Sequence, residues 1–113
     1  RLLDSLRIRH DVSLLEAEGG FHYYLTTNWT RVAEYEKEET FSLFLEHKNI
    51  NAVLVTERLV DDSRFRDDTE WQLFLNDPGK SGFYSITIPD SSWFLLVKKE
   101  LCDKPDEGER VCR

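Results

Sequence analysis

The sequence predicts an α/β fold, a small Rossmann-like domain with a mostly parallel sheet, flanking helices and a C-terminal antiparallel hairpin. Three observations lead to this expectation. The 113 residues are a usual length for one domain. Segments with strand character alternate with segments of helical periodicity, which is typical of a parallel sheet covered by helices. Two final apolar runs separated by a short turn predict the hairpin and its antiparallel edge.

The first expected strand is DVSLLEAE, residues 11–18, which ends at two glycines. FHYYLTTN, residues 21–28, is expected to form a short helix or a turn, and RVAEYE, residues 31–36, the second strand. We interpret residues 1–10 as a linker or the end of a preceding helix, because their leucines have helical spacing. These leucines are Leu2, Leu3 and Leu6.

The clearest helix is FSLFLEHK. Thr40 is expected to cap its start, because a threonine hydroxyl accepts a hydrogen bond from a backbone N–H of the first turn. Phe41, Phe44 and Leu45 recur at the spacing of one helix face. Asn49 is expected to end the helix, because asparagine tolerates the left-handed backbone that follows many helices.

A buried strand is expected next, in INAVLVTE at residues 50–57, because the run from Ala52 to Val55 is apolar without a break. RLVDDSRFRDD, residues 58–68, is expected to be a polar loop. Its acidic residues come in adjacent pairs with arginines between them, which favours local ion pairs and helix capping over a calcium loop. These acids are Asp61, Asp62, Asp67 and Asp68.

The second helix is expected in TEWQLFLND, where Thr69 and Gln72 have the spacing of a capping box. Trp71, Phe74 and Leu75 are its expected buried stripe, and the following NDPGK ends it. The hairpin strands are GFYSITIP and SWFLLVKKEL, joined through Pro-Asp-Ser-Ser. The single α/β domain is therefore expected to span residues 11–101.

Charge and composition exclude several functions. The net charge of −7 disfavours nucleic acid, which is bound through lysine and arginine, and it disfavours docking on anionic lipid. No apolar run approaches the roughly 20 residues that span a bilayer. The chain contains no methionine, so we interpret it as a processed product or an excised piece of a longer protein.

The corner after the first strand is the best candidate for a binding site, because ligands of open α/β sheets bind beyond the carboxyl ends of the strands. Its residues are Glu16, Glu18, Gly19, Gly20 and His22. The glycines allow a close approach of the backbone, and the histidine can act as an acid or base. The alternative is a tight strand-to-helix turn whose aromatic residues pack inward. We find no motif for a catalytic triad, a metal ion or a cofactor, and expect none of them.

Two further features concern modification. Cys102 and Cys112 flank the polar loop DKPDEGERV in the C-terminal tail, residues 102–113, and a disulfide between them would close it. Paired cysteines point to an oxidising compartment. Asn28 begins the triplet NWT, a weak candidate for N-glycosylation.

FSLFLEHKNINAVLVTERL, RFRDDTEWQLFLNDPGKSGFYSITI and WFLLVKKEL together resemble the C-terminal soluble domain of polytopic GT-C type membrane glycosyltransferases. These include enzymes similar to the lipid-phosphate-sugar mannosyltransferases and aminoarabinose transferases, and EAEGGFHYYL resembles the corner after the first strand of the same domains. The resemblance covers residues 11–101. The matching segments are 41–49, 50–56, 68–75, 82–88 and 93–99. In that family the catalytic acid lies in loops on the membrane helices, so no catalytic residue is carried over to this chain.

The resemblance implies a non-catalytic, extracytoplasmic accessory domain that assists binding of an acceptor or carbohydrate. Its expected partners are the transmembrane part of its own parent chain and carbohydrate or a lipid-linked sugar, without nucleic acid. Trp29 and Trp93 can stack on sugar rings or belong to the core. The alternatives are a free-standing Rossmann-like domain for ligand or protein binding, and a small enzyme that uses the corner at 16–22.

We predict that Cys102 and Cys112 form a disulfide, because they flank a single polar loop and no other cysteine is present. Intact mass after alkylation of the native, unreduced protein should show no blocked thiol, and two should appear after reduction. Two alkylated thiols without reductant would reject the pairing.

Overall fold

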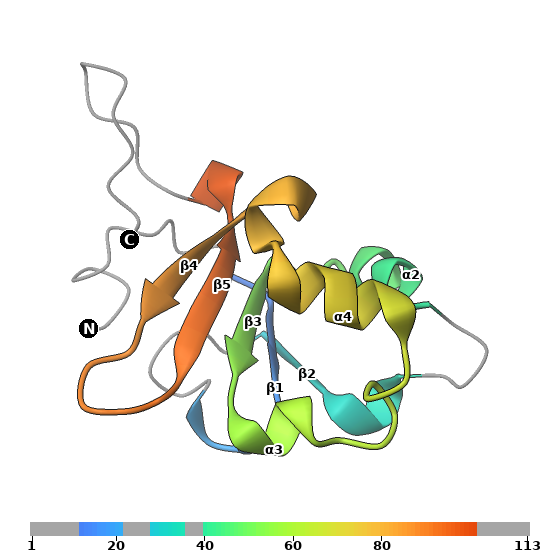
Figure 1. The fold of residues 1–113 in the computed structure, drawn as a ribbon, viewed down its shortest axis with the longest axis horizontal. Helices are drawn as coiled ribbons and strands as arrows, with labels where there is room; N and C mark the ends of the chain where they lie inside the picture. The colour runs from blue at the N-terminus through green and yellow to red at the C-terminus, as the bar shows by residue number, and fades with distance from the viewer. Residues whose placement is uncertain (1–11, 22–27, 36–39, 102–113) are drawn as a thin grey trace.

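The computed structural model describes residues 12–21, 28–35 and 40–101, and within them the fold is α/β. A single sheet has helices packed against it, and its strand order is β2-β1-β3-β5-β4 (Figure 1). The strands are β1 Leu14–Glu16, β2 Trp29–Arg31, β3 Ala52–Val55, β4 Phe83–Thr87 and β5 Phe94–Lys98. The α/β class and the C-terminal hairpin predicted from the sequence are therefore confirmed.

The sheet is mixed and only partly parallel. β1 pairs in parallel with β2 and β3, whereas β5 pairs antiparallel with β3 and β4. The prediction of a mostly parallel, Rossmann-like sheet is thus not clearly met. Burial explains the arrangement. Leu95, Leu96 and Val97 are all buried, so β5 is covered on both faces and suits a place inside the sheet, whereas Ser85 and Thr87 of β4 are exposed, as edge-strand residues can be.

The helices are α2 Phe41–His47, α3 Glu57–Val60 and α4 Thr69–Asn76, with short 3-10 turns at η2 Val32–Glu34, η3 Pro78–Ser81 and η4 Lys99–Leu101. The hydroxyl of Thr40 accepts a hydrogen bond from the N–H of Leu43, which confirms the predicted cap of α2. Asn49 has a positive φ of 54° just after the helix, in keeping with its predicted role as terminator.

The predicted second strand at 31–36 is wrong. The strand ends at Arg31, whose N–H donates to Oε2 of Glu34, and the chain then turns through η2. This local hydrogen bond competes with continued pairing, and the turn buries Val32 under the helices. Residue 36 lies outside the described residues.

The segment 58–68 is not simply a polar loop, because α3 lies at its start. Thr56 caps α3 by accepting a hydrogen bond from the N–H of Leu59. Leu59 and Phe65 are fully buried, so two apolar side chains anchor this charged segment. Asp62 pairs with Arg64 at 3.1 Å, which is the local ion pairing expected from the sequence.

The capping box predicted at Thr69 and Gln72 is wrong by one residue. Asp68 is the N-cap of α4, and its Oδ1 accepts from the N–H groups of Glu70 and Trp71. The side chain of Gln72 instead donates to the carbonyl of Arg66 at 2.8 Å. Aspartate is the stronger capping residue of the two adjacent candidates, so the helix begins behind it.

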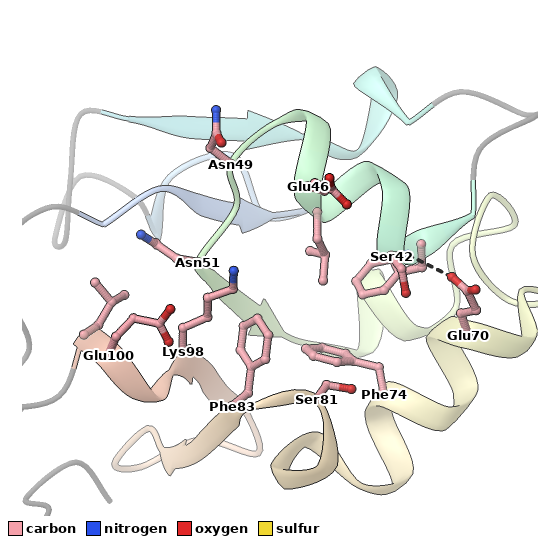
Figure 2. Close-up of a pocket in the computed structure, with 13 residues that line it drawn as sticks. Ser42, Glu46, Asn49, Asn51, Glu70, Phe74, Ser81, Phe83, Lys98 and Glu100 are labelled. Carbon is pink, nitrogen blue, oxygen red and sulfur yellow. Dashed lines mark hydrogen bonds between the residues drawn. The ribbon is translucent and has the colours of Figure 1, made fainter.

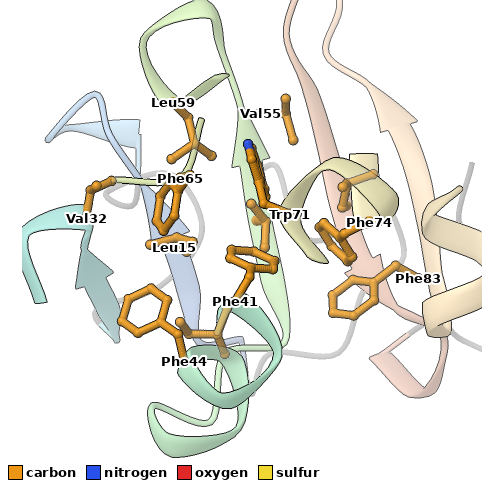
Figure 3. Close-up of a cluster of buried hydrophobic side chains, with 13 residues drawn as sticks. Leu15, Val32, Phe41, Phe44, Val55, Leu59, Phe65, Trp71, Phe74 and Phe83 are labelled. Carbon is orange, nitrogen blue, oxygen red and sulfur yellow. The ribbon is translucent and has the colours of Figure 1, made fainter. Parts of the chain in front are cut away.

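The helices cover one face of the sheet and enclose an aromatic core (Figure 3). Phe41 of α2 lies at its centre, with ring centroids 5.5 Å from Phe65, 4.8 Å from Trp71 and 5.2 Å from Phe74. Such aromatic contacts contribute roughly 0.5–1.5 kcal/mol each beyond the burial of area. Phe41 therefore packs α2 against α4 through its contacts with Trp71 and Phe74.

The other face of the sheet carries a second apolar cluster. Its buried members include Leu14 of β1, Leu54 of β3 and Leu95 of β5. Phe21, Trp29 and Trp93 are partly buried and pack against this cluster. The strands at the centre of the sheet thus bury both faces, as the apolar run at 52–55 predicted.

One carboxylate connects the two main helices. Oδ2 of Asp68 accepts hydrogen bonds from the hydroxyl of Tyr35 at 2.6 Å and from the N–H of Phe41 at 3.1 Å, while Oδ1 caps α4. Asp68 therefore binds the N-terminal ends of both α2 and α4. Both ends carry partial positive charge, which an anion at this point stabilises.

We predict that Asp68→Ala lowers the free energy of unfolding by about 2–4 kcal/mol, because a helix cap is lost and partly buried donors lose their acceptor. Asp67→Ala is the matched control, since this exposed neighbour should change stability by no more than about 0.5 kcal/mol. Urea unfolding followed by tryptophan fluorescence measures both. Equal effects of the two substitutions would contradict the role assigned to Asp68.

Candidate functional site

The corner predicted as a site is held together by its own side chains. Glu16 is 1% exposed, and its Oε1 accepts from the N–H of Gly19 at 2.9 Å. Glu18 accepts from the hydroxyl of Thr56 at 2.7 Å and lies 3.5 Å from the guanidinium of Arg58. Glu18 thus ties the corner to the start of α3, whereas Glu16 closes the turn at Gly19. His22 lies outside the described residues.

The first glycine of the pair has a conformational role. Gly19 has a φ of +84°, which L-residues with a side chain rarely adopt, whereas Gly20 has an ordinary φ. A Cβ at either position would meet no atom within 4 Å. Position 19 therefore requires glycine because of its backbone angle. It does not require glycine for lack of space, since a side chain there would not collide with a neighbour. Phe21 follows and packs against the second apolar cluster.

Trp93 lies at the same end of the sheet as this corner. Its ring is 6.2 Å from that of Phe21 in an edge-on contact. The N–H of Glu57 and the hydroxyl of Ser92 donate to the exposed carboxylate of Glu57, and both bonds hold its pKa below the ordinary value of 4.5.

Asn28, the glycosylation candidate, is exposed, and its carbonyl accepts from the N–H of Leu14. Cys102 and Cys112 lie outside the described residues.

A groove of about 570 Å³ lies between α2, α4 and the ends of β4 and β5 (Figure 2). Asn51 precedes β3, Phe83 begins β4 and Lys98 ends β5, so the groove lies at the amino ends of β3 and β4. The predicted corner lies at the carboxyl end of β1, which is the opposite end of the parallel strands β1 and β3. The groove has the volume of a small-molecule site, for which roughly 300–1,000 Å³ is usual.

The groove combines an apolar floor with hydrogen-bonding groups around it. Phe74 and Phe83 lie side by side on the floor, with ring centroids 4.9 Å apart (Figure 2). Leu45 of α2 adds a half-buried aliphatic surface. The polar groups are carboxylates, an ammonium, amides and hydroxyls, from Ser42, Glu46, Asn49, Asn51, Glu70, Ser81, Lys98 and Glu100.

The two ends of the groove differ in what fixes their side chains. At one end, Glu70 accepts from the N–H of Ser42 at 3.0 Å, and this bond is the main cause that lowers the pKa of Glu70 from its ordinary 4.5. Glu70 is therefore ionised at neutral pH. Toward the other end, Lys98 and Asn51 line the groove (Figure 2). Oδ1 of Asn51 accepts from the N–H of Ser13 at 2.7 Å.

Two groove side chains are available to a ligand. Within the part of the chain that the structure describes, neither the Glu46 carboxylate nor the Lys98 ammonium forms a hydrogen bond or an ion pair. They offer an acceptor and a donor, respectively, on different walls of the groove. The arrangement can hold a small polar molecule over an apolar floor by hydrogen bonding.

The sequence contained a partial signal for this groove. Four groove residues recur at helical spacing along α2 and just after it, beside the residues that face the core. These are Ser42, Leu45, Glu46 and Asn49. Apart from Asn51, the remaining walls come from segments more than twenty residues further along the chain, whose meeting depends on β5 lying inside the sheet.

Among residues 12–21, 28–35 and 40–101, no group of three or more His, Cys, Asp or Glu is placed to hold a metal ion. No helix in the described part of the chain is long and apolar enough to cross a membrane. Comparison of the chain with protein-family models, with curated proteins and with solved structures finds no match. The groove and the corner must therefore be interpreted from their own chemistry.

We predict that Gly19→Ala lowers the free energy of unfolding by about 1 kcal/mol or more, because alanine is strained at positive φ. Gly20→Ala is the matched control and should cost less, since its backbone angle is ordinary. Thermal and urea unfolding of the two variants measure the difference. A larger loss for Gly20→Ala than for Gly19→Ala would contradict the conformational role.

Proposed function

We propose that this chain is a non-catalytic accessory domain on the extracytoplasmic side of a membrane glycosyltransferase, where it assists binding of carbohydrate or acceptor. The groove between α2 and α4 is the observation that carries the proposal. Its apolar floor, the half-buried Leu45 beside the buried rings of Phe74 and Phe83, suits the apolar face of a sugar ring, and its rim supplies both donors and acceptors for hydroxyl groups.

The positions of the polar groove residues favour binding of a ligand that both donates and accepts hydrogen bonds. Glu46 and Lys98 present side-chain groups that have no partner among the described residues, from different walls, and a polyol carries donors and acceptors for both. The floor is rigid, since Phe74 and Phe83 belong to the aromatic core beneath the helices. A preformed floor lowers the entropy lost when a ligand binds.

We predict that a neutral glycoside binds in this groove. Titration of the isotope-labelled chain with methyl α-D-mannoside, methyl β-D-glucoside and methyl β-D-galactoside should shift the amides of Ser42, Asn49 and Asn51 for at least one of them. The expected dissociation constant is on the order of millimolar, as for a small neutral ligand with few contacts.

Glu46→Gln should weaken this binding about tenfold, because a hydrogen bond to a charged acceptor contributes about 1.5–3 kcal/mol. Glu57→Gln removes an exposed carboxylate outside the groove and should leave the affinity unchanged. No amide shift with any of the glycosides, or shifts confined to the surroundings of Trp93 and Glu57, would reject the groove as the carbohydrate site.

The parent protein offers an independent test. The complete gene should encode about ten or more apolar segments of bilayer-spanning length before this domain. A complete gene without such segments would contradict the proposal and favour the second candidate, a free-standing ligand-binding domain that uses the same groove.

A further inference from the structure

The two edges of the sheet differ in how they are protected. β2 forms one edge with three residues, and the N–H of Arg31 is already bound to Glu34. β4 forms the other edge with five residues, and none of them is charged or proline. Natural sheets protect edge strands with short length, charge, proline or bulges, because an open edge pairs with other strands. β4 has none of these protections.

The register identifies which backbone groups of β4 are open. The N–H of Lys99 donates to the carbonyl of Gly82, and the N–H of Ile88 donates to the carbonyl of Trp93. Alternate positions in an antiparallel ladder face the partner, so Tyr84 and Ile86 bond to β5. Phe83, Ser85 and Thr87 then direct their N–H and C=O groups away from the sheet.

A further bond agrees with this assignment. The N–H of Lys98, the residue opposite Phe83, donates to the carbonyl of Asn51 on the β3 side. Phe83 therefore shares no ladder bond with Lys98. No residue in the described ranges pairs with the outer side of β4, and the outward groups of Ser85 and Thr87 have no hydrogen-bond partner.

We propose that β4 is a self-association edge, on which β4 of a second copy of this chain pairs antiparallel across a two-fold axis centred at Ser85. Ser85 would exchange both of its backbone hydrogen bonds with Ser85 of the second copy, and Phe83 would pair with Thr87. Tyr84 would lie opposite Ile86, a favourable aromatic and β-branched pair. This inference goes beyond the proposed function and does not depend on it.

Charge favours a second copy in this orientation. The start of the strand is cationic, with Lys80 just before it and Lys98 opposite its first residue, while the turn at its end carries Asp90. Antiparallel pairing of two copies brings each cationic start to the anionic end of the other. Parallel pairing would instead bring lysines together, which is unfavourable. The uncharged strand between them lets two chains of net charge −7 meet without direct repulsion.

The test is sedimentation velocity of the 113-residue chain from about 10 μM to about 1 mM. The mass should rise with concentration from 13.4 kDa toward twice that value. Ser85→Lys should raise the dissociation constant at least about tenfold, because like charges would then lie directly opposite. Ser63→Lys is the control, the same change at an exposed position away from the sheet, and should have no such effect.

The register itself is tested by charge complementation. Ser85→Lys and Ser85→Glu should each weaken self-association alone, and an equimolar mixture should restore it, because only pairing of residue 85 with itself joins opposite charges. Amide exchange spectra of each variant show that the fold is kept. A wild-type chain that stays monomeric throughout, equal effects of Ser85→Lys and Ser63→Lys, or a mixture that associates no better than either variant alone would overturn the proposal.

Discussion

The arrangement of the helices depends on the carboxylate of Asp68. One oxygen caps α4 and the other accepts from Tyr35 and from the first residue of α2. A single anion therefore stabilises two helix starts that lie far apart in the sequence and binds the segment before α2 to both. Helix ends leave several N–H groups without intrahelical partners, and a shared acceptor satisfies such groups from two helices with one half-buried side chain.

This junction also positions the groove. Phe41 begins α2 beside Asp68, and its ring joins Trp71 and Phe74 of α4. Glu70 adds a second bond between the helices by accepting from Ser42. With the two helices joined at one end, the groove between them extends toward Asn51 and Lys98 (Figure 2). The same contacts that form the core thus determine the shape of the candidate site.

The sequence predicted those features that depend on neighbouring residues. The α2 helix with its Thr40 cap, the buried run at 52–55 and the final hairpin follow from periodicity and turn chemistry, and the structure has all of them. The position of β5 inside the sheet could not be predicted so directly. It depends on which strand, besides β4, pairs with the segment that contains Leu95, Leu96 and Val97. The groove depends on that position, so its walls could not be assembled from local patterns.

The remaining errors have local causes. Asp68 and Thr69 are adjacent capping residues, and the aspartate that caps α4 also accepts hydrogen bonds from Tyr35 and Phe41, which are distant in sequence. The segment 58–68 was predicted to be a polar loop because most of its residues are charged. That pattern gave no weight to Leu59 and Phe65, whose side chains are buried in the core. The strand expected at 31–36 was ended by Glu34, whose carboxylate binds the backbone of Arg31.

The central claim is that Asp68 makes α2 and α4 one cooperative unit, and native-state hydrogen exchange tests it most directly. The amides of Phe44 and Lys48 in α2 and of Gln72 and Asp77 in α4 all donate within their helices or caps. The account predicts that these four amides share one opening free energy within about 0.5 kcal/mol, and that Asp68→Asn lowers all four together. Opening of α2 at a free energy more than about 1 kcal/mol below that of α4 in the wild-type chain would contradict it.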